Sequence, residues 1–342
     1  MRVLQVMAGA RHGGAEAFFV RLAIALQRAG LDQRLLIRQH DERAGELEAA
    51  GLALRELRFR GRLDYSTPRR IRAEIRTWQP QVVLSWMSRA ASMTPRGDGS
   101  FVHCARLGGY YNLKYYRHCD HLIGNTPDIV DYLVGEGWPA ERAHYLPNFV
   151  YAGTQPAEPR ARHYTPRNAP LLLALGRLHH NKAFDVLLDA LARLPDVYLW
   201  LAGDGSQEAE LKAQASRRGV APRVRFLGWQ EDTAPLYAAA DAVVCPSRVE
   251  PLGNVVIEAW AQRKPVIAAA AAGPTFLIRD GETGLLVPID DSEALADALY
   301  RVLADREVAD SLGEAGHAAY AAQFTEEVVV RRYLDFFTKV AP

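Results

Sequence analysis

Two glutamates, Glu250 and Glu258, flank a stretch of chain that has the features of a phosphate-binding loop. The stretch follows an apolar, strand-like run at residues 242–245 and leads into a predicted helix at residues 255–262. Backbone N–H groups at a helix start are unpaired and lie at the positive end of the helix dipole, and a glycine lets a ligand approach closely. The residues that would offer such groups are Leu252, Gly253, Asn254 and Val255.

The two glutamates add hydrogen-bond acceptors to this phosphate site. Glu250 precedes the predicted helix, and Glu258 is expected about two turns into it. A carboxylate on the same side can accept hydrogen bonds from a ribose diol. The pattern therefore indicates a site for a nucleoside diphosphate with a further group attached. The ordinary alternative is a surface loop acid followed by a solvated helix residue, and the motifs described next favour the binding site.

Two cations follow another predicted strand, at residues 171–175. Arg177 and Lys182 lie in the sequence GRLHHNK, at a spacing that can clamp a diphosphate and neutralise a leaving group. Glycine motifs follow later strands, and one of them contains Gly228. No Asp-x-Asp triplet occurs in the sequence. We therefore expect no metal and no other cofactor, the diphosphate being held by cations and a helix start.

The first half of the chain carries weaker signals. Gly13 and Gly14 open a predicted helix, so they form either a tight turn or a close approach to a ligand. Glu16, His103, Tyr110 and Tyr111 are candidates for contact with a second substrate, although a core histidine is the simpler interpretation of His103.

The apolar runs and amphipathic stretches that must position these residues alternate along the chain. Strands are predicted at residues 3–7, 35–37, 52–57, 82–84, 101–105, 121–124, 171–175, 197–202, 224–227, 242–245 and 266–270. Helices are predicted at residues 15–29, 69–78, 128–134, 184–193, 208–218, 255–262, 293–303 and 328–337. This alternation predicts an α/β protein with two doubly wound, Rossmann-like domains facing a central cleft.

A proline-rich stretch at residues 151–170 separates the two predicted domains. We expect an N-terminal domain at residues 1–155 on the acceptor side and a C-terminal domain at residues 165–322 on the donor side. The helix at residues 323–342 is expected to cross back to the N-terminal domain.

Composition excludes several classes of protein. The 342 residues carry a net charge of +1, which argues against a protein that coats nucleic acid. Three scattered cysteines favour a reducing compartment. The N-terminus has the pattern of a strand rather than a signal peptide, and no apolar run is long enough to span a bilayer. We expect a cytoplasmic protein.

Taken together, these motifs resemble the retaining glycosyltransferases of family 4, which have the GT-B fold. The resemblance implies that Glu258 binds the ribose and that Glu250 lies beside the donor sugar. It implies that Arg177 and Lys182 hold the diphosphate, with the 252–255 amides contributing and Gly228 near the base. Gly13 and Gly14 would contact the donor.

Three departures from the family pattern occur. Ala183 stands where a glycine usually follows the clamp lysine, and Arg263–Lys264 precede the strand at 266–270 where a small residue is common. Arg106 stands at the end of a first-domain strand where many members have a histidine that reaches the sugar. We expect Arg106 to take that place, with His103 as the alternative.

The resemblance implies sugar transfer from a nucleotide-diphosphate sugar to a glycan or lipid-linked acceptor, in cell-envelope polysaccharide or lipopolysaccharide synthesis. Glu250 is expected to position the sugar while the leaving phosphate takes the acceptor's proton. Eight arginines at residues 55–76 and the mixed tyrosines and cations at 110–117 indicate either attachment to the anionic inner face of a membrane or an ordinary arginine-rich surface with a partly buried tyrosine cluster. The alternatives are an epimerase or phosphorylase with a related fold, and a non-catalytic nucleotide-sugar-binding protein.

Overall fold

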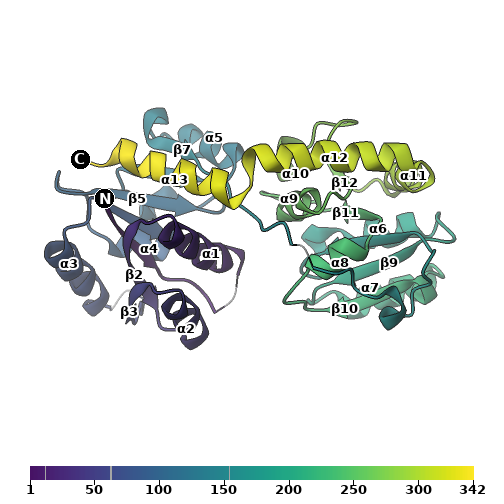
Figure 1. Cartoon of the computed structure of the whole chain (residues 1–342), viewed down its shortest axis with the longest axis horizontal. Helices are drawn as coiled ribbons and strands as arrows, with labels where there is room; N and C mark the ends of the chain where they lie inside the picture. Colours follow the sequence, from purple (N-terminus) through teal and green to yellow (C-terminus); the bar gives the residue numbers. More distant parts are fainter. Residues whose placement is uncertain (12, 62–63, 154) are drawn as a thin grey trace. The chain divides into compact units, whose positions relative to one another are not determined.

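The structure is a computed structural model that describes residues 1–11, 13–61, 64–153 and 155–342 (Figure 1). The chain divides into two compact units. The first combines Met1–Asn148 with the C-terminal Glu326–Pro342, and the second is Phe149–Thr325. Each unit has its own parallel sheet and its own apolar core. Among the described residues, no helix combines the length and the apolar character needed to cross a bilayer.

The first unit contains a seven-stranded sheet in the order β3-β2-β1-β4-β5-β6-β7, with parallel pairing throughout. Its strands are β1 (Arg2–Met7), β2 (Asp32–Arg38), β3 (Ala53–Leu57), β4 (Val82–Trp86), β5 (Val102–Leu107), β6 (His121–Gly124) and β7 (Ala143–Tyr145). The order turns at β1, because β2 continues the sheet on one side and β4 on the other. Loops at such a turning point diverge at the carboxyl edge of the strands, where doubly wound sheets bind ligands.

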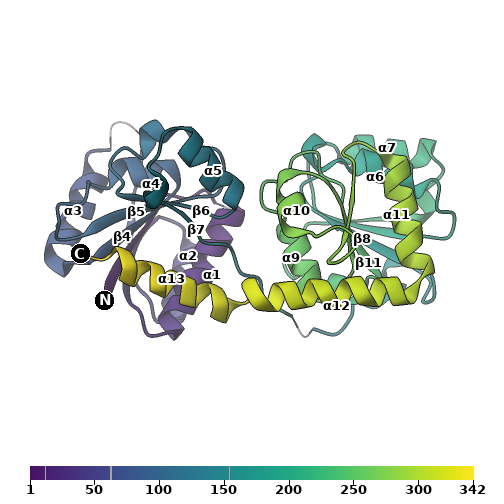
Figure 2. The same cartoon turned by 90° about the horizontal axis from the view of Figure 1, so that it is seen from above.

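Helices cover the sheet of the first unit. They are α1 (Gly14–Arg28), α2 (Asp41–Ala49), α3 (Ser66–Trp78), α4 (Met87–Met93), α5 (Pro127–Gly135) and α13 (Glu326–Val340). Leu4 and Val6 of β1 belong to a buried cluster with Ile71, Ile75 and Trp78 of α3. The C-terminal helix α13 contacts α1, beside which it lies in Figure 2. The C-terminal residues therefore complete the core of the N-terminal unit.

The second unit contains a six-stranded parallel sheet in the order β10-β9-β8-β11-β12-β13. Its strands are β8 (Leu171–Leu175), β9 (Tyr198–Ala202), β10 (Val224–Gly228), β11 (Ala242–Cys245), β12 (Val266–Ala269) and β13 (Leu285–Val287). The order turns at β8, so the loops after β8 and β11 diverge at the carboxyl edge. These two loops carry Lys182 and Glu250.

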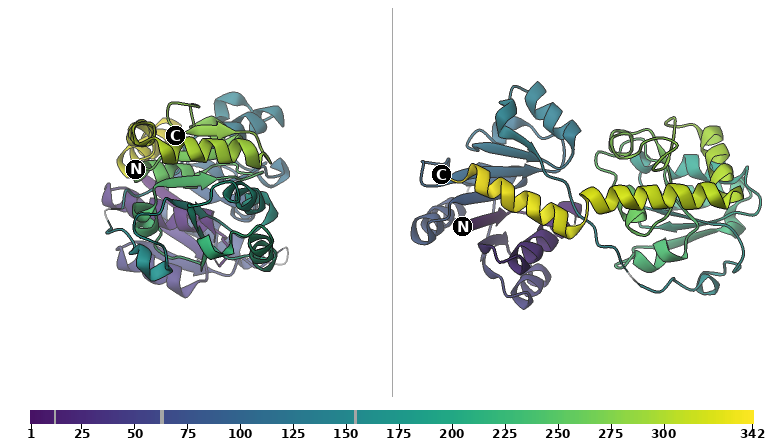
Figure 3. Two further views of the ribbon diagram at one scale, coloured as in Figure 1. Left: turned by 90° about the vertical axis from the view of Figure 1, so that its right-hand side faces the viewer. Right: turned by 45° about the horizontal axis from the view of Figure 1, so that its top comes forward.

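Helices lie on both faces of this second sheet (Figure 3). They are α6 (Phe184–Leu191), α7 (Glu208–Arg217), α8 (Ala234–Ala239), α9 (Asn254–Ala261), α10 (Ala272–Leu277), α11 (Ser292–Ala304) and α12 (Arg306–Gln323). Leu172 of β8 packs with α6, α7 and α11, whereas Leu171 and Leu173 pack with α8, α9 and the end of α12. The continuous apolar run of β8 follows from this burial on both faces.

The predicted alternation of strands and helices is confirmed, and two differences bear on the site. Strand β5 continues to Leu107, because Arg106 pairs with Trp86 and Leu107 with Gly124. Arg106 therefore lies inside the strand and not after it. Helix α9 begins at Asn254, so Glu258 lies a little over one turn into the helix and not two.

Candidate functional site

Lys182 and Glu250 come together in the second unit, although 68 residues separate them. Lys182 ends the short 3-10 helix η4 (His180–Lys182) after β8, and Glu250 lies in the loop after β11. The Lys182 ammonium donates a hydrogen bond to Glu250 Oε2 in a salt bridge. The exposed fractions of the two side chains are 25% and 11%, so both groups still reach solvent. A phosphate that enters here would meet a cation whose present partner is a carboxylate.

Glycines bring the backbone close around Lys182. The aliphatic part of its side chain crosses Gly176, where an added Cβ would lie 3.3 Å from Lys182 Cε. An added Cβ on Gly203 would lie 2.0 Å from the carbonyl oxygen of Gly176, and one on Gly205 would lie 2.3 Å from that of Leu178. The predicted glycine motif after β9 therefore supports the loop that carries the cation, since only glycine allows backbone to meet backbone there.

The backbone conformation at Ala183 explains why a glycine is common after the clamp lysine. It has φ 52, in the left-handed region, and it immediately precedes α6. Side chains other than glycine cost about 1–2 kcal/mol in that conformation. The chain keeps the conformation with an alanine that is fully buried.

Several groups fix the carboxylate of Glu250. The N–H of Gly253 donates to Oε1 at 3.2 Å, and the hydroxyl of Ser247 donates to Oε2 at 3.4 Å. The N–H of Gly273 donates to the Glu250 carbonyl oxygen at 2.7 Å, and a Cβ on Gly273 would collide with this loop. Glu250 thus presents its carboxylate beside Lys182 in one orientation. Neither Ser247 nor Gly273 was predicted to belong to the site from the sequence.

Helix α9 starts at the end of the Glu250 loop. Gly253 precedes it with φ 77, a conformation that favours glycine, and its carbonyl accepts a hydrogen bond from Val256 N–H at 2.9 Å. The helix therefore begins within the predicted 252–255 stretch, but the Gly253 N–H already donates to Glu250. Contact of the Leu252, Asn254 and Val255 amides with a donor stays a prediction. The neighbouring amides of such a start suit an anion.

Glu258 projects from α9 and is half-buried. The hydroxyl of Tyr237 in α8 donates to its Oε2 at 2.8 Å. Burial and the charge of Glu258 raise the pKa of Tyr237 well above its usual range, so the hydroxyl keeps its proton. Tyr237 thus orients one oxygen of the carboxylate that is predicted to bind ribose.

Arg177 and Gly228 occupy different positions. Arg177 is exposed, and within the described ranges its guanidinium has no hydrogen-bond or ion-pair partner. Gly228 ends β10 with φ 67, and its carbonyl accepts from Gly203 N–H at 2.8 Å. Gly228 is therefore tied to the glycine loop that supports Lys182. The contact of either residue with a donor stays a prediction.

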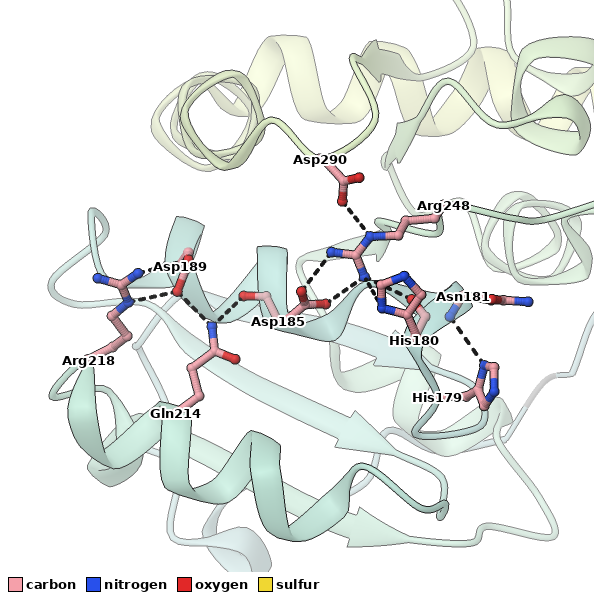
Figure 4. Close-up of polar contacts among 9 residues, drawn as sticks. All are labelled: His179, His180, Asn181, Asp185, Asp189, Gln214, Arg218, Arg248 and Asp290. Carbon is pink, nitrogen blue, oxygen red and sulfur yellow. Dashed lines mark hydrogen bonds and ion pairs between the residues drawn. The ribbon is translucent and has the colours of Figure 1, made fainter.

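Arg248 is a site residue that sequence analysis missed, and Figure 4 shows its contacts. Its guanidinium binds Asp185 of α6 through two hydrogen bonds of 2.9 and 2.7 Å, and its Nε lies 2.5 Å from Asp290 Oδ1. It also donates to the carbonyl of His180 at 2.8 Å. Burial alone would raise the pKa of Asp185, but the hydrogen bonds and charge of Arg248 together with backbone N–H donors lower it. Arg248 therefore ties the Lys182 loop and the start of α6 to the loop that carries Glu250.

Replacing Arg248 by methionine is expected to lower kcat/KM of transfer about ten- to a hundredfold, because small misplacements of positioned groups have effects of that size. Arg218 is the matched control, since it makes a similar paired contact with Asp189 of the same helix, at 2.8 and 3.0 Å (Figure 4). Steady-state kinetics and melting temperatures of R248M, R248K and R218M would test this. Partial recovery in R248K and unchanged kinetics in R218M are expected; equal losses in R248M and R218M would contradict a positioning role.

In the first unit, the glycine loop before α1 is organised by Glu16. Its carboxylate accepts a hydrogen bond from Ala10 N–H at 2.7 Å, and the side chain is 7% exposed. A Cβ on Gly13 would lie 2.3 Å from Glu16 Oε2, whereas the space at Gly14 is open. Gly13 is thus explained by Glu16, and Gly14 is the position that a ligand can approach. Contact of Glu16 with an acceptor stays a prediction.

Arg106 is 2% exposed, in the core of the first unit. Its Nε donates to the hydroxyl of Tyr333 at 2.9 Å, and a second nitrogen donates to Asn148. The guanidinium lies over the rings of Phe18 and Trp86. Arg106 therefore links β5 to α13, and its predicted contact with the donor has no support in this arrangement.

His103 has no exposed surface. Its ring nitrogens contact the Ser85 hydroxyl at 2.8 Å and the His118 carbonyl at 3.0 Å. Burial lowers the pKa of His103 to about 4, so the ring is neutral at physiological pH. The alternative of a core histidine describes this residue, and nothing here supports the predicted contact with an acceptor.

The two candidate tyrosines lie nearer the surface. Tyr110 is 48% exposed, and its hydroxyl bonds to Asp128 of α5. Tyr111 is half-buried; burial and the charge of Glu16 raise its pKa, and the charge of Arg106 opposes them. Contact of Tyr110 or Tyr111 with an acceptor stays a prediction. Within the described ranges, no three acidic, histidine or cysteine side chains are grouped so as to hold a metal ion.

Comparison with known proteins identifies the family and the fold of the chain. The family model "Glycosyltransferase Family 4" matches residues 12–152, and the model "Glycosyl transferases group 1" matches residues 169–305. The lipopolysaccharide core biosynthesis glycosyltransferase LpsE of Rhizobium meliloti (strain 1021) is 40% identical over 95% of this chain and 96% of its own length. The corresponding LpsD of that organism is 34% identical over 99% of this chain and 98% of its own length.

A solved structure shows the same fold. Anabaena HepE, in complex with UDP and glucose, has a TM-score of 0.82 and 21% identity, and the match covers 99% of this chain and all of that one. The predicted family and fold are confirmed: the chain is a family 4 glycosyltransferase with the GT-B fold.

Proposed function

We propose that this enzyme transfers a sugar from a nucleoside diphosphate sugar to the growing core of a lipopolysaccharide, with retention of the anomeric configuration. The observation that carries the proposal is the Lys182–Glu250 pair beside the start of α9. The two relatives LpsE and LpsD are named for lipopolysaccharide core synthesis, and HepE binds UDP and glucose. These names support the acceptor and the donor class.

In this proposal the donor diphosphate replaces Glu250 as the partner of Lys182. Its oxygens take hydrogen bonds from Lys182, Arg177 and the amides at the start of α9. The charge that develops on the leaving diphosphate is then stabilised by groups already in place. Glu250, released from Lys182 but still held by Gly253 and Ser247, faces the sugar. The leaving phosphate accepts the proton of the acceptor hydroxyl, so the step needs no metal and no other cofactor.

The test is a transfer assay on the full chain with uridine, guanosine and adenosine diphosphate sugars and a truncated lipopolysaccharide core as acceptor. Thermal shift identifies the donor first, because a ligand that binds the folded state raises the melting temperature. Mass spectrometry should show the core heavier by one sugar, and NMR should show the donor's anomeric configuration. Donor binding without transfer would indicate a binding protein, and conversion of the donor without acceptor would indicate an epimerase; either result contradicts the proposal. Sugar release that requires inorganic phosphate would indicate a phosphorylase.

We further propose that the first unit attaches the enzyme to the anionic inner face of a membrane, where a lipid-linked acceptor resides. A pocket of about 310 Å³ is lined by Ser92, Lys114, Tyr115, Arg117 and His118, and it offers two cations and an aromatic ring to a headgroup. The basic stretch of the same unit adds seven exposed arginines, which do not line the pocket: Arg55, Arg58, Arg60, Arg69, Arg70, Arg72 and Arg76. Arg62 of that stretch lies outside the described residues.

Vesicle co-sedimentation would test the attachment. The full chain is expected to bind vesicles that contain phosphatidylglycerol, but not pure phosphatidylcholine, and to dissociate as salt is added. Basic residues near an anionic surface contribute about 1 kcal/mol each, so the double variant K114Q/R117Q should bind roughly thirtyfold less. The control R301Q/R306Q changes two exposed arginines of the second unit. Equal binding by both double variants would contradict the proposed surface.

A further inference from the structure

A pocket of about 640 Å³ opens at the carboxyl edge of the first sheet, between the loop after β1 and the start of α2. Three arginines line it: Arg11 in the loop, Arg38 at the end of β2, and Arg43 in α2. The carboxyl edge beside the central strand is where doubly wound sheets bind ligands. Neither the donor residues of the second unit nor the basic residues proposed for the membrane line this pocket.

Arg43 distinguishes the pocket from an ordinary surface hollow. It is 5% exposed, and one terminal nitrogen donates to the carbonyls of Ala10 at 2.7 Å and Arg11 at 3.3 Å. The other terminal nitrogen, Nη1, is buried without a hydrogen-bond partner in the part of the chain that the structure describes. A buried cationic N–H without an acceptor is costly, so this group indicates a ligand oxygen.

The surrounding charges define the ligand's class. Arg11 and Arg38 are exposed on the pocket wall, with long side chains that can close over a ligand. Asp41 and Glu42 also line the pocket, in the first turn of α2, where acids favour the helix dipole. Burial lowers the pKa of Arg43, and the negative charge of Glu16 offsets part of this effect. Three arginines against two lining acids leave the lining with a net positive charge, which favours a small anion.

We propose that this pocket binds an anionic substituent of the acceptor, a phosphate monoester or a sugar carboxylate. Arg43 is its fixed donor, and Arg11 and Arg38 complete the contact. Guanidinium groups form paired hydrogen bonds with both kinds of anion. The assignment to the acceptor rests on the proposed sugar transfer, whereas the anion site itself does not.

The first experiment uses inorganic phosphate as the probe. At constant ionic strength, phosphate should raise the melting temperature of the full chain more than chloride does. K182M serves as the background, because phosphate can also bind at the donor site. In that background R11Q/R38Q should abolish most of the phosphate effect, and the control R331Q, an exposed arginine of the same unit, should keep it. If phosphate raises the melting temperature of the R11Q/R38Q and R331Q variants equally, the anion site is overturned.

The second experiment measures transfer to intact, phosphatase-treated and carboxyl-reduced acceptors. Loss of a charge-assisted hydrogen bond typically weakens binding about tenfold or more, so R38Q should raise KM for the anionic acceptor by about tenfold and leave kcat nearly unchanged. The treatment that abolishes this difference identifies phosphate or carboxylate. Unchanged KM in R38Q with every acceptor would overturn the acceptor assignment. Absence of transfer by the wild type would contradict the proposed function, while a phosphate effect lost in R11Q/R38Q would still support the pocket.

Discussion

Replacing Glu250 by glutamine is expected to reduce kcat of sugar transfer by about 10²–10³-fold while changing the donor Kd less than tenfold. The size follows from other enzymes, in which removal of one preorganised electrostatic group has an effect in that range. Glutamine keeps the length of the side chain and can still accept the hydrogen bond from Gly253 N–H. What it removes is the charge that is now paired with Lys182.

Donor binding should survive because the Lys182–Glu250 pair competes with the donor. In the free enzyme the ammonium already has a carboxylate partner, so an arriving phosphate must replace it. In E250Q that competition is gone, which offsets any contact that Glu250 makes with the sugar. K182M should show the opposite result, a donor Kd raised tenfold or more.

The double variant E250Q/K182M separates these effects. Because the two side chains are in contact, their contributions should not be additive. Single-turnover rates and calorimetric donor titrations on the wild type, E250Q, K182M and E250Q/K182M complete the double-mutant cycle. Full transfer by E250Q, or a donor affinity lost in E250Q as strongly as in K182M, would contradict the assigned roles.

Replacing Glu258 by glutamine is expected to raise the donor Kd about ten- to a hundredfold and to change kcat at saturating donor only a few fold. Hydrogen bonds to charged groups contribute about 1.5–3 kcal/mol each, which gives this range. An amide offers one accepting oxygen where the carboxylate offers two, and the hydroxyl of Tyr237 already donates to one of them.

Y237F is the control for Glu258, because it removes the orienting hydroxyl and leaves the carboxylate. Its donor Kd should rise less than that of E258Q. Titration with the nucleoside diphosphate alone should show the same order, since Glu258 is assigned to the ribose. An E258Q enzyme that binds nucleoside diphosphate like the wild type would remove Glu258 from the site.

Strands were the part of the fold that the sequence predicted best. The apolar runs at β6, β8 and β11 coincide with the observed strands, because a buried parallel strand must be apolar on both faces. The short helices α4, α8 and α10, of six or seven residues, were not predicted. Helices this short depend on tertiary packing more than on their own sequence. Helix α2 was missed because it buries Arg43 with only a few apolar residues.

In the site, local motifs were predictable and long-range partners were not. The helix start at Gly253 follows from its own sequence. Arg248 does not, because its acidic partner Asp185 lies 63 residues away, and only the folded sheet brings the two loops together. Arg106 shows the converse limit: the strand before it could be predicted, but neither its own place inside β5 nor the side-chain direction that buries it against Tyr333 could be.

The measurement that tests the central claim most directly is the calorimetric Kd of the matching nucleoside diphosphate for the wild type, E258Q, K182M and the control R218M. The claim is that the loops after β8 and β11 form the nucleotide site of the second unit. It predicts a Kd raised at least tenfold in E258Q and in K182M and unchanged in R218M. Equal affinities in all four proteins, or no binding of uridine, guanosine or adenosine diphosphate by the wild type, would contradict it.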